Sequence, residues 1–200
     1  MKITSIKQQI KRTDRYSIFV DGKYAFSLSE AALLESKLAS GDVLTAGQLK
    51  EFKKLSEDDK IYNQTLRYIA LRPRSKWEIE FYLQRKKTPL PQIEIILNKL
   101  SIIGLVDDEK FAQAFVNDRR LLKPTSRRKL TLELRKKRIS PDIIEQALGS
   151  EHADEQTALQ ATIGRKRRQT KYQDDQKLMQ YLARQGFNYH DIKAALTDDD

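Results

Sequence analysis

The sequence contains no cysteine, which excludes disulfide scaffolds, cysteine–zinc sites, iron–sulfur clusters and thiol catalysis. It also lacks any apolar run that approaches the ~18–20 residues of a membrane span, and its first residues have no signal-peptide core. We therefore expect a soluble protein of the reducing cytoplasm with no membrane partner.

The residues that usually mark enzymes are scarce. Only seven glycines occur and they are scattered, so neither a Walker A loop nor a dinucleotide-binding fingerprint is present. The two histidines, His152 and His190, have no partner at i±4. Asp107-Asp108-Glu109 precedes an apolar helical run, so we interpret it as a helix start rather than a metal site. The sequence thus predicts no enzyme, no cofactor and no metal.

Basic side chains are abundant, because 38 lysines and arginines stand against 28 acids and give a net charge of +10. Residues 119–138 hold ten basic side chains and one acid, and residues 165–168 with Lys171 form a second run without an acid. Such runs often only solvate helix faces. A ten-to-one bias over twenty residues nevertheless favours a surface for a polyanion, and nucleic acid is the polyanion we expect.

The first 56 residues predict a small β-rich head. Asp21-Gly22 separates two β-prone runs and is a strong hairpin signal, because both central positions of a type I′ turn need φ > 0. Residues 3–10 supply a third strand. Capping boxes at 27–30 and 45–48 predict two helices that pack on this sheet, and the second helix is expected to run through residue 52.

From about residue 60 the sequence repeats itself. Residues 134–148 align without gaps on 182–196, with apolar residues at offsets 0, 5, 10, 13 and 14, and Leu83 starts a third copy. Each copy follows another helix-like stretch, the first at 62–71. The predicted fold is mainly α: tandem three-helix repeats form an elongated curved array behind the head. The expected boundaries are 1–56 for the head and 57–106, 107–150 and 151–200 for the repeats.

Three ordered motifs on these repeats resemble the RecX family of regulatory proteins. They are Arg74-Ser75-x-x-Glu78-Ile79-x-x-x-Leu83, Leu100-x-x-x-Gly104-Leu105-Val106-Asp107-Asp108-x-x-Phe111-Ala112 and Arg127-Arg128-x-x-x-x-Glu133-Leu134-Arg135-x-Lys137-x-Ile139. The head is also similar to the N-terminal segment of many members from Gram-positive bacteria. Arg138 departs from the family, which usually has glycine there, as the third repeat has at Gly186. We therefore expect strain or a different helix cap at Arg138.

The resemblance implies a modulator of RecA, the recombinase that polymerises on single-stranded DNA. RecX-like proteins bind the RecA–DNA filament in its helical groove and inhibit its ATPase, its growth and strand exchange, which modulates recombination, DNA repair and the SOS response. The implied partners are RecA, single-stranded DNA and also double-stranded DNA, and the implied state is a cytoplasmic monomer. The expected contact residues are Arg127, Arg128, Arg135, Lys136, Arg74, Arg85, Arg165, Arg167 and Arg168, of which the last three rest on charge alone.

Two other functions are compatible with the residues. A sequence-specific transcription regulator could use the three-helix units as helix-turn-helix modules, although the basic residues spread over all repeats rather than one recognition helix. A protein-interaction solenoid could instead present its lysines and arginines to acidic protein surfaces.

An array of three stacked repeats is expected to be longer than a compact globule of the same size. Small-angle X-ray scattering of the monomer should therefore give a radius of gyration above the ~16–17 Å of a compact 200-residue protein. A value within that compact range would contradict the stacked arrangement.

Overall fold

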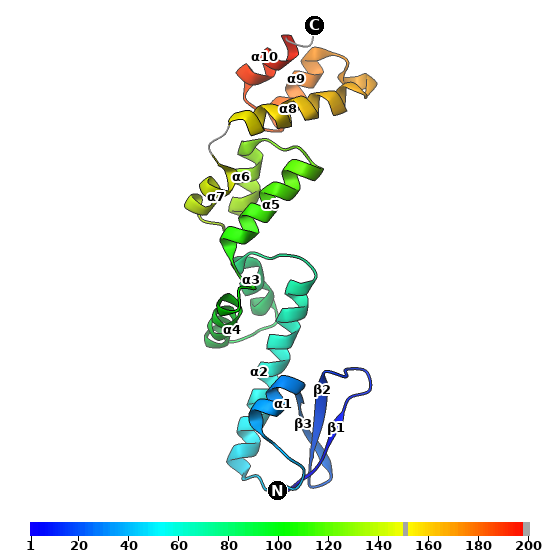
Figure 1. Ribbon diagram of the computed structural model, residues 1–200, viewed down its shortest axis with the longest axis vertical. Helices are drawn as coiled ribbons and strands as arrows, with labels where there is room; N and C mark the ends of the chain where they lie inside the picture. The colour runs from blue at the N-terminus through cyan, green and yellow to red at the C-terminus, as the bar shows by residue number, and fades with distance from the viewer. Residues whose placement is uncertain (150–151, 198–200) are drawn as a thin grey trace. The chain divides into compact units, whose positions relative to one another are not determined.

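The computed structural model describes residues 1–149 and 152–197 (Figure 1). In this part of the chain there are ten α-helices, one short 3-10 helix and a three-stranded antiparallel sheet, so the mainly helical fold is confirmed. Two compact units are present: residues 1–73 with 79–100 form the first, and residues 74–78 with those from 101 onward form the second. No helix among the described residues is long and apolar enough to cross a membrane.

The head is a meander of three strands, β1 (Ile3–Gln8), β2 (Arg15–Val20) and β3 (Lys23–Ser29). Asp21 and Gly22 join β2 to β3 with φ values of 47° and 79°, as the Asp-Gly turn predicts. One face of the sheet packs against helix α1 (Glu30–Ser36) and the long helix α2 (Ala46–Ala70), which Figure 1 shows beside it. The small sheet is therefore stabilised by helices rather than by its own pairing alone.

Helix α2 differs from the sequence-based expectation. The helices expected over 45–52 and 62–71 are one continuous helix of 25 residues, opened by a capping box in which Thr45 and Gln48 bond each other's backbone N–H groups. No glycine or proline interrupts the chain between residues 48 and 70, so nothing in the backbone chemistry ends the helix early. The expected boundary at 56/57 thus falls inside a helix.

A buried ion pair joins α2 to the sheet. The Arg15 guanidinium on β2 donates to Asp59 Oδ2 at 2.9 Å, and the two side chains are only 3% and 7% exposed. The other contacts of the Asp59 carboxylate come from the Ser29 N–H at 2.9 Å, the Ser29 hydroxyl at 2.5 Å and the Asn63 amide at 2.8 Å. The buried charge is thus both paired and hydrogen-bonded, which is the condition under which a buried carboxylate is tolerated.

Replacement of Asp59 by alanine should destabilise the first compact unit by about 3–5 kcal/mol, because the Arg15 charge would remain buried without its partner. The free energy of opening can be measured by native-state hydrogen exchange at the β2 and β3 amides. Asp14→Ala is the matched control, since the Asp14–Arg67 pair also joins the head to α2 but is about half exposed. It should cost less than about 1 kcal/mol. Equal losses in the two variants would contradict a structural role for the buried pair.

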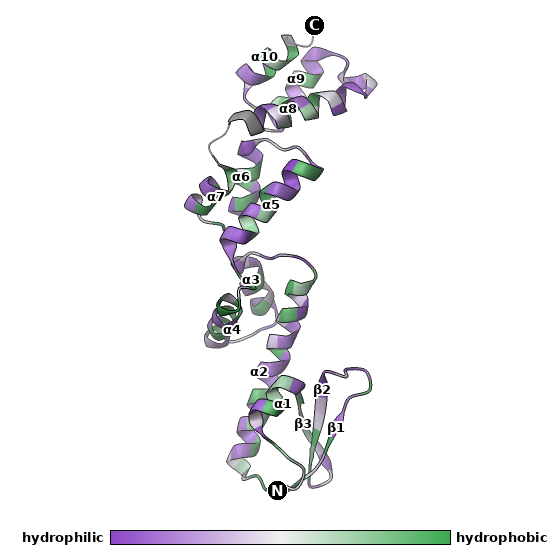
Figure 2. Cartoon of the chain, in the orientation of Figure 1, coloured by the Kyte–Doolittle hydropathy of each residue, from purple (hydrophilic) through white to green (hydrophobic). Residues whose placement is uncertain are grey.

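The second compact unit contains two three-helix bundles, each with its own apolar core. The first bundle comprises α5 (Asp108–Leu122), α6 (Arg127–Lys136) and α7 (Pro141–Leu148). The second comprises α8 (His152–Arg167), α9 (Asp175–Arg184) and α10 (Tyr189–Thr197), with the 3-10 helix η1 (Thr170–Tyr172) after α8. Purple and green residues alternate along these helices in Figure 2, because each helix buries one face only.

The sequence repeat is also a repeat of burial and backbone geometry. Helices α3 (Lys76–Arg85) and α4 (Leu90–Ile102) carry the first copy of the pattern. The residues at the shared offsets are buried in all three copies, including Leu83, Leu134 and Leu182 at offset 0. At offset 4, Lys87, Arg138 and Gly186 have φ values of 59°, 60° and 91°. In each copy the N–H of the following residue donates to the carbonyl of the offset-0 leucine, at 3.2–3.3 Å.

Arg138 therefore keeps the left-handed helix end that the three copies share, at the cost of a strained backbone. Arg138→Gly should raise the free energy of unfolding by about 0.5–1 kcal/mol, since glycine adopts positive φ without steric cost. Gly186→Ala should instead lower it by about 1–3 kcal/mol, because an added Cβ would lie 2.8 Å from the Ser126 Oγ. Chemical denaturation of the full chain provides the measurement, and stabilisation by both substitutions would contradict the shared geometry.

Candidate nucleic-acid interface

The N-terminal turn of α6 is held in place by three contacts with the last bundle. The N-cap Ser126 is fully buried, and its hydroxyl donates to the Gln185 carbonyl oxygen at 2.6 Å while it accepts the Lys129 N–H. The Lys129 ammonium donates to Gln185 Oε1 at 2.6 Å, and the Arg127 N–H donates to Glu155 Oε2 at 3.0 Å. The backbone N–H groups of Arg127 and Lys129, which have no partner inside the helix, are thereby hydrogen-bonded within the protein.

The N-terminal turn of α3 makes three equivalent contacts with the α5–α7 bundle, which follows it in the chain. The buried Ser75 hydroxyl donates to the Lys137 carbonyl at 3.0 Å, and Glu78 pairs with the Lys137 ammonium at 3.0 Å. The Lys76 N–H donates to Asp108 Oδ1 at 2.8 Å. Ser75 and Ser126 occupy the same place in the repeat. The hydrogen bond from the N-cap serine to the end of another helix is therefore a repeated feature of the fold.

Half of the ten basic residues in 119–138 are used inside the protein. Arg119 pairs with Glu133 at 3.0 Å and lies over the Phe115 ring, and Arg120 donates to the Leu148 carbonyl at 2.9 Å. The other three with internal contacts are Arg127, Lys129 and Lys137. The remaining five are exposed: Lys123, Arg128, Arg135, Lys136 and Arg138. The charge run is thus partly a structural feature, and the surface available to a polyanion is smaller than the sequence suggests.

The outward face of α6 gathers three of these exposed residues. Arg128, Leu132 and Arg135 follow at i, i+4 and i+7, and Lys136 is the next residue along the same side. Leu132 is 50% exposed. The opposite face buries Leu130 and Leu134 in the core of the bundle, so the helix cannot rotate its basic face inward. Three cations are therefore presented on a fixed helix around one apolar side chain.

Arg127, another of the expected contact residues, makes hydrogen bonds within the protein. Its guanidinium donates to the carbonyl oxygens of Leu148 and Gly149 at the C-terminal end of α7. A cation at a helix C-terminus also complements the helix dipole. The sequence could not show this, because the helix end that it caps lies 21 residues further along the chain.

The other expected contact residues differ in their surroundings. Arg85 at the end of α3 is exposed, and Arg74 just before that helix is half-buried. Arg165 and Arg168 are exposed at the end of α8. Arg167, in contrast, donates to the Gln173 carbonyl at 2.9 Å and pairs with Asp175, so its guanidinium organises the turn that follows α8.

The acidic run 107–109 forms the start of α5, as interpreted from the sequence. Asp107 is the N-cap, and its hydrogen bonds from the backbone N–H groups of Lys110 and Glu109 hold the pKa of the Asp107 carboxyl below its ordinary value. Burial raises the pKa of Asp108, which accepts the Lys76 N–H. In the described part of the chain no three potential ligands gather into a metal site. His190 is exposed, and the side chain of His152 lies outside the described residues.

Comparison with known proteins identifies the relatives of this chain. Four family models match it: the regulatory protein RecX N-terminal domain at residues 1–45, and the first, second and third three-helix domains of RecX at 62–100, 107–148 and 153–196. The regulatory protein RecX of Listeria monocytogenes serovar 1/2a is 32% identical over 204 residues, which cover 99% of this chain and 76% of the relative. The chain belongs to the RecX family.

Other members of the RecX family support the assignment. The regulatory protein RecX of Bacillus subtilis is 31% identical and that of Halalkalibacterium halodurans 33%, with 97% and 98% of this chain covered and 75% and 77% of the relatives. A crystal structure of a regulatory protein RecX matches 100% of this chain and 99% of its own, with a TM-score of 0.73 and 28% identity. RecX from Lactobacillus salivarius shares the fold, with a TM-score of 0.61 and 23% identity over 70% of this chain and 95% of its own.

Loss of the Ser126 hydroxyl should loosen the contact between α6 and the last bundle. Ser126→Ala removes both the helix cap and the donor to the Gln185 carbonyl, so we expect a loss of about 2–3 kcal/mol. Hydrogen exchange at the amides of Gly186 and Phe187 can measure it. Ser140→Ala is the matched control, because Ser140 is an exposed N-cap of α7 and its loss should cost only about 1 kcal/mol. An equal effect of both substitutions on these two amides would contradict the interpretation.

Proposed function

We propose that this RecX-family chain regulates RecA by binding the filament that RecA forms on single-stranded DNA. Binding inhibits the RecA ATPase, filament growth and strand exchange, and so modulates recombination and DNA repair. The chain acts in the cytoplasm as a monomer, without a cofactor and without catalysis of its own. The family assignment supports the choice of RecA, and the observation that carries DNA contact is the outward basic face of α6.

Three properties of this face support contact with a nucleic-acid filament. Arg128, Arg135 and Lys136 are exposed, so their charges can neutralise phosphates and release counterions. The helix that carries them is fixed at its start by the buried Ser126, so the loss of conformational entropy on binding is small. Leu132 offers an apolar contact among the charges. Arg74, Arg85, Arg165 and Arg168 are additional contact residues in this proposal.

Arg127 and Arg167 take a different place in the proposal. Their guanidinium groups already bond backbone carbonyls, so contact with DNA would compete with internal hydrogen bonds. We therefore rank them behind the exposed arginines. Charge reversal at Arg127 would disturb the end of α7 and would not test DNA binding cleanly.

A sequence-specific transcription regulator is the alternative function. The arginines and the lysine of the α6 face can bind either phosphates or the guanine edges of a duplex, so binding to DNA of different sequences has to separate the two functions. Similar affinity for unrelated random sequences would favour the filament regulator, whereas strong preference for one duplex sequence would favour the alternative.

Charge reversal of the α6 face tests the proposal directly. The triple variant Arg128→Glu, Arg135→Glu and Lys136→Glu should fold normally, because exposed substitutions usually shift stability by less than ~0.5 kcal/mol each. It should bind single-stranded DNA more weakly and flatten the log–log salt slope by about two units, at ~0.7 per phosphate. The concentration that half-inhibits the RecA ATPase should rise at least about tenfold.

The matched control reverses three exposed basic residues of the head, at Lys11, Arg12 and Lys23. This variant carries the same change in net charge, so a general electrostatic effect would appear in both proteins. Loss of inhibition in the head variant with full inhibition in the α6 variant would contradict the proposed site.

A further inference from the structure

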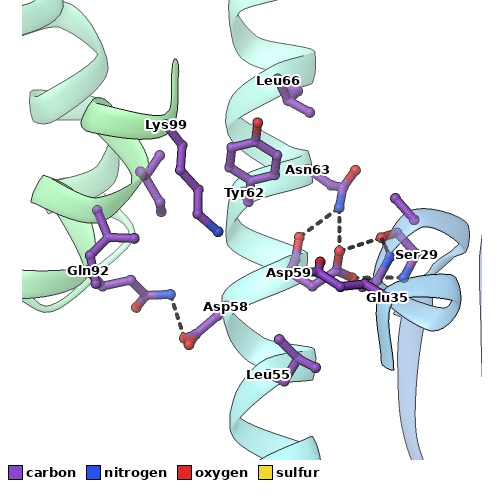
Figure 3. Close-up of a pocket in the computed structure, with 14 residues that line it drawn as sticks. Ser29, Glu35, Leu55, Asp58, Asp59, Tyr62, Asn63, Leu66, Gln92 and Lys99 are labelled. Atoms are coloured by element: carbon purple, nitrogen blue, oxygen red, sulfur yellow. Dashed lines mark hydrogen bonds between the residues drawn. The ribbon is translucent and has the colours of Figure 1, made fainter. Parts of the chain in front are cut away.

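A hollow of about 320 Å³ lies within the first compact unit and is separate from the basic face of α6. Three helices line it: α1, the middle of α2, and α4 (Figure 3). On α2, Leu55, Asp58, Tyr62 and Leu66 follow at near-helical spacing and so share one side of the helix. Concave surfaces of this size with a few polar groups are the usual form of a binding site.

The walls of the hollow combine apolar surface with carboxylates. Ile95 of α4 and Leu55 of α2 are 57% and 39% exposed, although both are large apolar side chains. Glu35 extends from α1 toward α2, and Asp58 accepts the Gln92 amide at 2.6 Å with oxygen capacity remaining (Figure 3). Asp59 also lines the hollow, but its charge is matched by the buried Arg15.

A positively charged side chain of the protein itself, that of Lys99, lies in the hollow. The Lys99 ammonium on α4 lies 5.9 Å from the centre of the Tyr62 ring, which is a cation–π distance. Lys99 is exposed, so an incoming cation of better shape can displace it. Arginine is such a cation, because its planar guanidinium stacks on aromatic rings and bonds carboxylates.

We propose that this hollow binds a segment of a protein partner in which an arginine stands beside a leucine or isoleucine. The guanidinium lies on the Tyr62 ring against Asp58 and Glu35, and the apolar side chain covers Leu55 and Ile95. Nucleic acid is disfavoured here, because its phosphates would be repelled by the carboxylates of Asp58 and Glu35. The hollow differs in this respect from the chain as a whole, whose net charge is +10. The site does not depend on the proposed function, since it uses none of the residues of the α6 face.

The experiment is a titration of the ¹⁵N-labelled full chain with short peptides, followed by amide chemical shifts. The probes are acetyl-Leu-Arg-Leu-amide, the same peptide with neutral citrulline in place of arginine, and a ten-nucleotide oligo-dT. The arginine peptide should shift amides in residues 31–35, 55–66 and 92–99 in a saturable manner, at least about tenfold more tightly than the citrulline peptide. Oligo-dT should leave these amides unchanged.

Variants separate this site from general charge effects. Glu35→Gln with Asp58→Asn should weaken the arginine peptide about tenfold. Glu57→Gln with Glu94→Gln removes two exposed carboxylates from the same helices α2 and α4 outside the hollow, and should have no effect. If Asp58→Asn disturbs folding, Glu35→Gln alone decides, since Glu35 is exposed.

Four results would overturn the proposal. They are equal affinity for the arginine and citrulline peptides, shifts of the same amides by oligo-dT, equal weakening by the two variant pairs, and an arginine-peptide titration that does not saturate. Because none of these readouts involves RecA, failure here leaves the regulation of RecA to be judged by its own experiment.

Discussion

The second compact unit depends on a hydroxyl group at the start of a helix, which caps its own helix and bonds the end of another. Ser126 does this for α6 and α9, and Ser75 does it for α3 and α6. A serine can fill both roles because its oxygen accepts while its proton donates. The equivalent residue of the last bundle is Asp174, an ionised acceptor that caps α9 and faces solvent.

This arrangement explains why the local charge alone does not locate the site. Cations such as Arg120 and Arg127 complete the C-terminal end of α7, and Lys137 pairs with Glu78 beside the serine contact. What remains exposed on α6 is a short face with a fixed direction. The same framework that uses half of the basic run therefore fixes the direction of Arg128, Arg135 and Lys136, which form the face that we propose for contact with a polyanion.

The sequence was sufficient for features determined by local chemistry. The Asp21-Gly22 hairpin, the caps at Thr45 and Asp107, and the repeated apolar offsets all follow from turn geometry, capping and helical periodicity. Features that depend on distant partners could not be predicted. Asp59 lies in an acidic run without an evident role, yet it pairs with Arg15, 44 residues away. The hollow beside Tyr62 likewise needs three helices from separate parts of the sequence.

The most direct test of the account asks what the α6 face touches in the assembled RecA filament. A photo-crosslinking amino acid at Leu132, in the centre of the face, should form crosslinks to RecA or to single-stranded DNA in the complete filament. The same group at Tyr189, which is 62% exposed on α10, should form few. Crosslinks from position 189 with none from position 132 would contradict the proposal that α6 carries the contact.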